Sequence, residues 1–201
     1  MFVHGTPGSG RDWEDLMGRV GAFARAIAPD MPGFGGADKP KDFDYTVAGY
    51  ARHLGGILDA LGVQRAHLVL HDFGGSWGLA WAVAHPEALA SVTLIDTGVL
   101  IDYSWHKYAR VWRTPVAGEL LQASTSRFGF RQLAGKENPG LRRDQIDRIF
   151  DAGKPRATKL ATRRLFRATD ADSGERELSA PFADRITALA FWKCSRLSAS
   201  K

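Results

Sequence analysis

The 201-residue sequence predicts an α/β fold with a mostly parallel, doubly wound sheet. Short apolar runs typical of buried strands alternate with longer segments whose apolar residues recur at helical spacing. In addition, one of these runs leads through a glycine-rich turn into a helical segment. The expected strands lie near residues 1–4, 23–28, 66–71 and 91–96, and the expected helices of this part near 46–61 and 75–84.

The helix expected near 46–61 has both a start signal and an apolar stripe. Thr46 is a good N-cap residue because its hydroxyl can accept a hydrogen bond from a free backbone N–H group of the first turn. Leu54, Ile57, Leu58 and Leu61 follow at helical spacing. The segment therefore predicts a helix packed on the sheet.

The turn after the strand at 66–71 is the most informative part of the chain. Asp72 follows the strand directly, and Gly74 and Gly75 lie between it and the next helix. A sharp strand-to-helix turn strains its central residue, exposes that side chain above the sheet and demands small neighbours. The free N–H groups of the helix favour negative charge there. Asp72 is the candidate nucleophile.

A second interpretation of the same turn makes a serine the nucleophile. Residues 74–78 fit the G-x-S-x-G pattern, with Ser76 as the nucleophile of an esterase or peptidase. In that frame the strand would have to run through Asp72, Gly74 and Gly75, which are poor strand formers. The sequence favours Asp72 and leaves Ser76 as the alternative.

The motif His71-Asp72-Phe73-Gly74-Gly75 resembles the His-Asp-Trp-Gly turn of epoxide hydrolases and haloalkane dehalogenases in the α/β-hydrolase superfamily. In these families the nucleophile usually stands thirteen residues before the His of a His-Pro pair, as Asp72 does before His85. The resemblance implies an α/β-hydrolase fold with a helical cap. It also implies an ester intermediate formed on Asp72.

Two further segments extend the resemblance towards the N-terminus. His4-Gly5-Thr6-Pro7 resembles the His-Gly-x-Pro motif, which implies an oxyanion hole formed by the backbone N–H groups of Thr6 and Phe73. The turn-rich segment 29–40 resembles the Asp-x-Pro-Gly-x-Gly-x-Ser loop of the superfamily, with a structural role.

After residue 98 the pattern changes to amphipathic helical stretches near 103–127, 141–152 and 155–168. By resemblance, residues 1–98 form the hydrolase core, 99–180 the cap, and 181–201 the start of a returning core strand with an aberrant tail. Tyr103 and Tyr108 are candidate proton donors from the cap. The sequence favours a place in the core for the aromatic residues of this part and leaves a substrate pocket as the alternative; these residues are Tyr103, Trp105, Tyr108, Trp112 and Phe128.

Several departures from the family pattern limit the expected activity. No histidine follows His106, although the resembled enzymes use a C-terminal His to activate water. Thr6 and Phe73 replace the Asn and Trp that hold a departing halide, which argues against dehalogenation. We expect an epoxide-hydrolase-like chain, truncated at both ends, that is inactive for turnover. A fragment without any catalytic role is the other alternative.

The composition sets limits on other functions. The chain is 44% hydrophobic, contains one cysteine and has a formal net charge of +5. Its basic residues are scattered, with no nucleic-acid-binding signature, and it shows no signal peptide or membrane-length apolar run. We expect a cytoplasmic enzyme acting on a small molecule, with no cofactor, metal, nucleic-acid or membrane partner. The sequence leaves the oligomeric state open.

Overall fold

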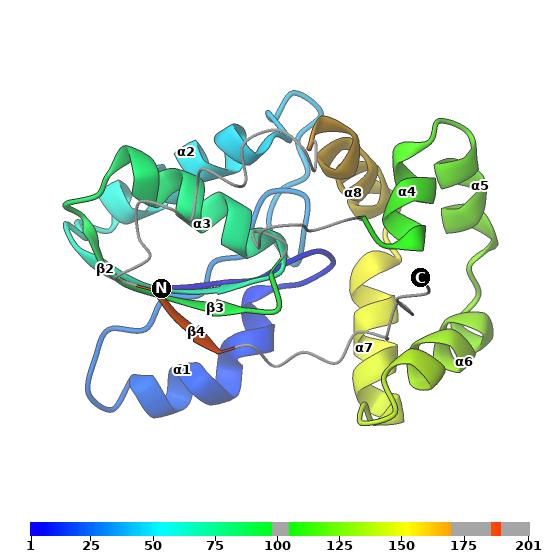
Figure 1. The fold of residues 1–201 in the computed structure, drawn as a ribbon, viewed down its shortest axis with the longest axis horizontal. Coiled ribbons are helices and arrows are strands. Elements are labelled where there is room, and N and C mark those ends of the chain that lie inside the picture. Colours follow the sequence, from blue (N-terminus) through cyan, green and yellow to red (C-terminus); the bar gives the residue numbers. More distant parts are fainter. Residues whose placement is uncertain (98–104, 170–185, 190–201) are drawn as a thin grey trace, which may run out of the picture.

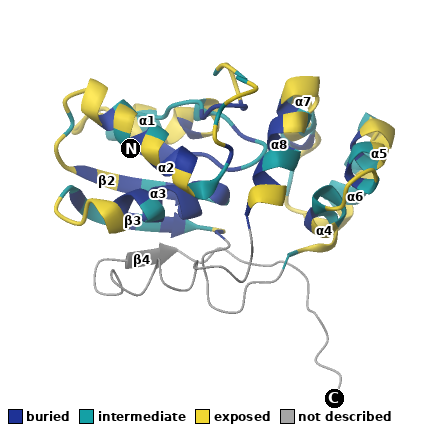
Figure 2. Cartoon of the chain, turned by 90° about the horizontal axis from the view of Figure 1, so that it is seen from above, coloured by how far each residue is buried: buried dark blue, intermediate teal, exposed yellow. Residues whose placement is uncertain are grey.

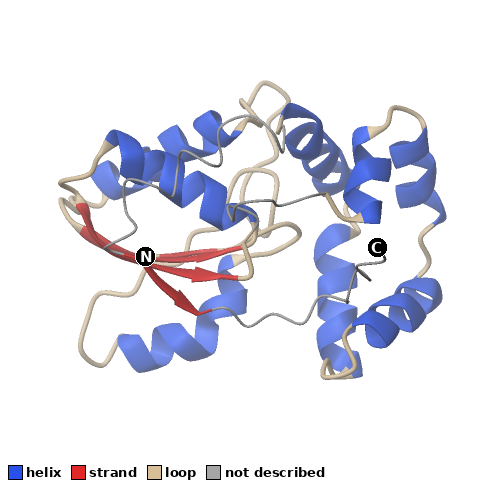
Figure 3. Cartoon of the chain, in the orientation of Figure 1, coloured by secondary structure: helices blue, strands red, loops and turns tan. Residues whose placement is uncertain are grey.

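The structure, a computed structural model, describes residues 1–97, 105–169 and 186–189. Four parallel strands pair in the order β1 (Phe2–Val3), β2 (Ala66–His71), β3 (Leu89–Ile95) and β4 (Ile186–Leu189) (Figure 3). Because the strands are parallel, their carboxyl ends meet at one edge of the sheet, where ligands bind in open α/β folds. The strands expected near 1–4, 66–71 and 91–96 are confirmed with small shifts of their ends.

The helices of the core cover both faces of the sheet. A short 3-10 helix η1 (Gly10–Trp13) leads into α1 (Glu14–Val20), which lies on the face opposite α2 (Val47–Ala60) and α3 (Phe73–Ala84) (Figure 1). Thr46 caps α2 as predicted, since its Oγ1 accepts a hydrogen bond of 3.0 Å from the Gly49 amide. Most of α3 is buried, because it lies between the sheet and α2 (Figure 2).

The strand expected near 23–28 is absent from the structure. Residues 25–30 are not in any helix or strand, and their link to the sheet is a hydrogen bond of 2.8 Å from the Phe2 amide to the Ile27 carbonyl. The neighbouring strand β1 is only two residues long, and Pro29 has no N–H group to donate. A longer ladder of hydrogen bonds therefore has no partner groups here.

A group of helices lies beside the sheet and is named the cap here for its position: α4 (Lys107–Arg113), α5 (Ala117–Ser124), α6 (Arg127–Glu137), α7 (Arg143–Gly153) and α8 (Arg156–Ala168) (Figure 1). The expectation of one helical stretch over 103–127 is wrong. Thr114 is extended and Val116 has a φ of 67°, so the chain breaks around Pro115, which cannot continue a helix. The stretches expected near 141–152 and 155–168 correspond to α7 and α8.

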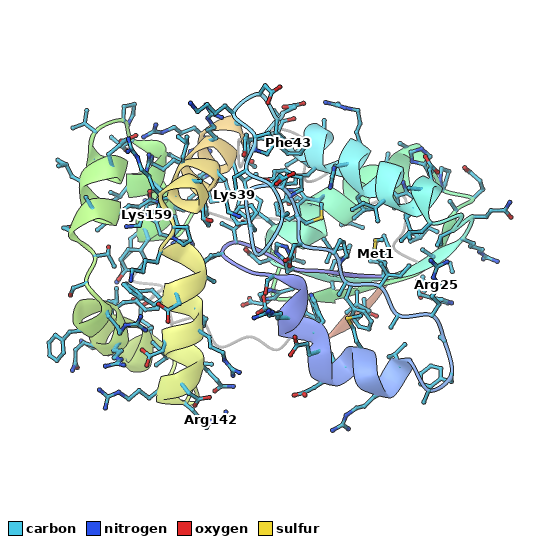
Figure 4. The ribbon with its side chains drawn as sticks, turned by 180° about the vertical axis from the view of Figure 1, so that it is seen from behind. Met1, Arg25, Lys39, Phe43, Arg142 and Lys159 are labelled. Atoms are coloured by element: carbon cyan, nitrogen blue, oxygen red, sulfur yellow. The ribbon has the colours of Figure 1, made fainter. Side chains whose placement is uncertain are left out.

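Side-chain bonds to backbone carbonyls hold the cap together and fasten it to the core. Arg113 of α4 donates to the carbonyl of Phe166 in α8 over 2.5 Å. Lys159, which is labelled in Figure 4, donates to the carbonyl of Gln122 over 2.7 Å. Arg164 reaches the carbonyl of Lys41 in the core over 2.6 Å. None of the helices in the described ranges is long and apolar enough to span a membrane.

Candidate active site

Asp72 occupies the turn between β2 and α3. It has φ 50° and ψ −124°, whereas β2 ends at His71 and α3 begins at Phe73. Such a conformation costs a residue with a Cβ about 1–3 kcal/mol and persists only where the surroundings enforce it. The structure therefore places Asp72 where the strand-to-helix spacing predicts the strained residue.

The glycines of the two motifs allow β1 and α3 to approach each other at Asp72. A Cβ on Gly74 would lie 2.5 Å from the carbonyl oxygen of Val3, and a Cβ on Gly5 would overlap the side chain of Asp72. Neither position has room for any side chain. These contacts are the close backbone approach that the motif glycines predict.

The carboxylate of Asp72 faces two backbone donors. The Thr6 amide donates to its Oδ2 over 2.7 Å, and the neighbouring Phe73 amide lowers the pKa of this carboxyl group. Thr6 lies 66 residues before Asp72, and the pairing of β1 with β2 brings the two together. Thr6 and Phe73 are the two amides that the sequence motifs nominate, and Thr6 forms a direct hydrogen bond with the Asp72 carboxylate.

The environment of Asp72 raises the pKa of its carboxyl group. Burial is the largest cause, because a partly desolvated carboxylate is less stable than its neutral form, and the negative charge of Asp96 acts in the same direction. The hydrogen bonds from Thr6 and Phe73, together with His71, oppose this shift. A carboxylate that is short of water yet held by two donors combines reactivity with fixed orientation.

Ser76 lies in a different environment from Asp72. It belongs to the first turn of α3, and its residue surface is 3% exposed. The turn conformation with positive φ falls on Asp72, four residues earlier. The geometry of a displayed nucleophile therefore applies to Asp72 and not to Ser76.

His4 connects the strand end that carries Thr6 to the following loop. Its side chain is fully buried, and its Nε2 accepts a hydrogen bond of 2.9 Å from the Met31 amide. The ring proton must then reside on Nδ1, which lies 2.7 Å from the Gly5 carbonyl and donates to it. Burial lowers the pKa of His4, which is consistent with this neutral tautomer. Its role in the structure is to position the Gly5–Thr6 segment.

The remaining histidine and tyrosine candidates differ in their surroundings. His71 ends β2 and packs edge-on against Trp13, with ring centroids 6.4 Å apart. His106 caps α4, since its Nδ1 accepts from the Ala109 amide over 3.2 Å. The Tyr108 hydroxyl donates to Glu137 of α6 over 3.4 Å, whereas Tyr103 lies outside the described residues.

Aromatic side chains of the cap pack against the residue that follows Asp72. Phe73 stacks on Trp105 with centroids 6.1 Å apart and meets Phe166 edge-on at 4.9 Å. Trp112 packs on Phe166 at 5.1 Å. A place in the core is wrong for Phe128, because this residue is 70% exposed on α6. Trp105 and Trp112 do lie on the side of the cap that meets the strand-to-helix turn.

Sequence reasoning missed Thr97, which contacts the turn from the end of β3. Its Oγ1 donates to the backbone carbonyl of Asp72 over 2.8 Å. No local pattern marks this threonine. The signal available in the sequence was general, since the residues that follow adjacent parallel strands meet at the same edge of the sheet.

The chain is similar in sequence to known hydrolases and dehalogenases. A 2-hydroxymuconate semialdehyde hydrolase of Pseudomonas sp. (strain CF600) is 39% identical over 100 residues, covering 48% of this chain and 35% of the relative. A haloalkane dehalogenase of Mesorhizobium japonicum is 33% identical over 155 residues, covering 73% of this chain and 50% of the relative. The chain thus spans between a third and a half of the length of these curated relatives.

The solved structure of the epoxide hydrolase CorEH superposes with a TM-score of 0.69 at 16% identity, covering 91% of this chain and 68% of that one. This similarity concerns the fold. The family model described as the alpha/beta hydrolase fold matches residues 1–178. Because this match covers most of the sequence, the chain belongs to the α/β-hydrolase family.

Proposed function

We propose that this chain carries the nucleophilic half of a hydrolase that attacks a small organic electrophile, of the epoxide type, with Asp72. The observation that supports this proposal best is the position of Asp72 at the strained turn, with Thr6 donating to its Oδ2 over 2.7 Å. Oδ1 is then the attacking atom. The donors fix the carboxylate before substrate arrives, which lowers the cost of orienting it.

The proposed reaction forms an ester on Asp72. Oδ1 attacks an epoxide carbon, the carbon–oxygen bond of the ring breaks, and its electron pair goes to the ring oxygen. A proton donor then protonates that alkoxide. We propose a cap tyrosine for this step, Tyr103 or Tyr108, of which Tyr108 donates to Glu137 in the structure. Oδ2 becomes the ester carbonyl oxygen and keeps its two amide donors.

An epoxide suits the site better than a haloalkane. A departing halide needs donors that point to it from outside the nucleophile, and Thr6 and Phe73 provide neither a side-chain amide nor an indole N–H group. The dehalogenase among the relatives therefore supports the ester-forming chemistry more than the choice of leaving group. The alternative of a serine esterase loses support because Ser76 lies within α3 and is 3% exposed.

We further propose that the reaction of this chain stops at the ester. All six histidines lie among the described residues. His4 has both ring nitrogens engaged by backbone groups, and His106 uses its Nδ1 to cap α4. General-base assistance contributes about 10²–10⁴-fold, so an ester without an activated water hydrolyses slowly.

Intact-protein mass spectrometry after incubation with styrene oxide tests both proposals. We expect one adduct on Asp72 that forms in the native chain and in Ser76→Ala but not in Asp72→Asn. Peptide mapping locates the modified residue. An adduct that depends on Ser76, or no adduct in a folded native chain, would overturn the assignment of Asp72.

Whether the ester is hydrolysed tests the proposal that the reaction stops there, independently of the proposal that Asp72 is the nucleophile. We expect about one equivalent of epoxide to be consumed per chain and retained as the ester, with no steady release of the diol, which gas chromatography measures. Repeated turnover that requires Asp72 would contradict the stalled ester and support the nucleophile. Variants His71→Gln and His106→Gln would then identify the base.

A further inference from the structure

We propose that Thr97 is a positioning residue for the oxyanion hole: it fixes the direction of the Phe73 N–H group by binding the carbonyl on the other side of the same peptide bond. The inference rests on the proposed role of Asp72 and Phe73. It assigns a function to a residue that lies 25 positions away along the chain, at the end of the neighbouring strand.

Two hydrogen bonds hold the backbone carbonyl of Asp72. Its oxygen accepts two hydrogen bonds, one of 2.8 Å from the Thr97 Oγ1 and one of 3.0 Å from the Gly75 amide. The Gly75 bond is local to the first turn of α3. Thr97 therefore provides the bond that ties this carbonyl to another strand of the sheet.

The peptide unit between Asp72 and Phe73 is rigid and planar. The carbonyl of Asp72 and the N–H of Phe73 belong to one plane, and in a trans peptide they point in opposite directions. Holding the oxygen on the Thr97 side therefore aims the hydrogen of Phe73 at the opposite side. The Phe73 amide lowers the pKa of the Asp72 carboxyl group, which is the effect of an N–H group directed towards a carboxylate.

The backbone of Asp72 is strained. With φ at 50° and ψ at −124°, the residue is outside the regions that side chains favour, so rotation of the 72–73 peptide would relieve strain and withdraw the Phe73 amide. The Thr97 hydroxyl opposes this rotation. Thr97 is 8% exposed, so water has little access to replace its bond.

The packing around Thr97 leaves no room for a longer residue at the start of the helix. A Cβ added to Gly75 would overlap the Thr97 Oγ1. The second motif glycine is thus needed at this position because the hydroxyl of Thr97 fills the space beside it. The close contact between the Thr97 hydroxyl and the Gly75 backbone therefore explains why a glycine stands at position 75.

The test compares Thr97→Val, which removes the hydroxyl and keeps the shape, with Thr97→Ser, which keeps the hydroxyl. Thr93→Val, the same change four residues earlier on β3, is the matched control. Two quantities are measured in the 201-residue chain: amide hydrogen exchange at Phe73 by NMR, and the rate of ester formation with styrene oxide by mass spectrometry.

In Thr97→Val we expect exchange at Phe73 to accelerate about tenfold while exchange at Val92 and Leu94 in β3 stays unchanged. We expect the maximal rate of ester formation to fall about tenfold, because the attacking carboxylate is held less firmly in its reactive orientation while Gly75 still holds the carbonyl. The half-saturating epoxide concentration should not change. Thr97→Ser and Thr93→Val should remain within about twofold of the native chain in both measurements.

Native exchange at Phe73 in a folded Thr97→Val chain would overturn the proposal. So would faster exchange with an unchanged rate of ester formation, because the hydroxyl would then stabilise the turn without positioning the donor. If the native chain forms no ester at all, the nucleophile assignment fails. The exchange measurement alone then decides whether Thr97 orients the Phe73 amide.

Discussion

The Thr6 amide nitrogen lies 2.7 Å from Oδ2 of Asp72, although 66 residues separate the two along the chain. The parallel pairing of β1 with β2 creates this contact, since Val3 is level with Leu70 and both strands end at the same edge. A carboxylate held in this way at a strained turn leads to predictions about its ionisation, its contribution to stability and the backbone that surrounds it.

The rate of ester formation should rise with pH through the ionisation of Asp72. Only the carboxylate attacks, and burial raises the pKa of this group. We expect a single ionisation whose midpoint lies above the ordinary aspartate value of about 3.9. Initial rates of adduct formation, measured from acid to neutral pH against protein-free controls for epoxide decay, test this. A midpoint at or below the ordinary value would contradict it.

Replacing Asp72 by asparagine should stabilise the fold at neutral pH. Because the folded-state pKa is raised, the cost of the buried charge applies above the unfolded pKa and disappears below it. We expect Asp72→Asn to gain about 0.5–2 kcal/mol at neutral pH, as is typical when a functional site is relieved of its strain or charge. Urea unfolding measures the gain.

The pH dependence of that gain provides its control. Below about pH 4 the native aspartate is protonated in both states, and the two chains should converge in stability. A gain that persists undiminished in acid would show that burial of the charge is not its cause.

Stability should fall as the pH drops through the range in which free histidine takes up a proton. His4 is buried in its neutral form, and its pKa is lowered, so the unfolded chain binds a proton that the folded chain rejects. We expect the loss to begin near the ordinary value of about 6.5. Burial also lowers the pKa of His53, which adds to the slope.

The variant His4→Gln isolates the contribution of that ring. Glutamine can replace one of its two hydrogen bonds, to Met31 or to Gly5, but not both. It should lower the free energy of unfolding at neutral pH by about 1–3 kcal/mol and reduce the loss of stability in acid. An equally steep acid dependence in the variant would assign the slope to other groups.

Gly74→Ala should destabilise the chain, whereas Gly56→Ala should not. A methyl group at residue 74 would lie 2.5 Å from the Val3 carbonyl, so strand or helix must move, at an expected cost of at least about 2 kcal/mol. Gly56 has nothing within 4 Å of the added methyl group and lies inside α2, where alanine should gain up to about 1 kcal/mol. Thermal unfolding of both variants checks the contrast.

The sequence by itself determined the features that depend on neighbouring residues. The apolar run at 66–71, the glycines after it and the distance to His85 placed Asp72 at the turn, and Thr46 marked the start of α2. Pro115 carried an equally local signal, and reading it would have divided the stretch over 103–127 into α4 and α5. Dihedral preferences and capping bonds act over a few residues, so sequence patterns record them.

The tertiary structure decided what depends on contacts between distant segments. It brought Thr6 and Thr97 to opposite sides of the Asp72 turn. It also placed backbone groups within hydrogen-bond distance of both ring nitrogens of His4, and it left Phe128 on the surface. The strand expected near 23–28 failed for the same reason, because a strand needs a partner of matching length and β1 has two residues. Strand pairing sets these relationships, and no single segment encodes the register of its partner.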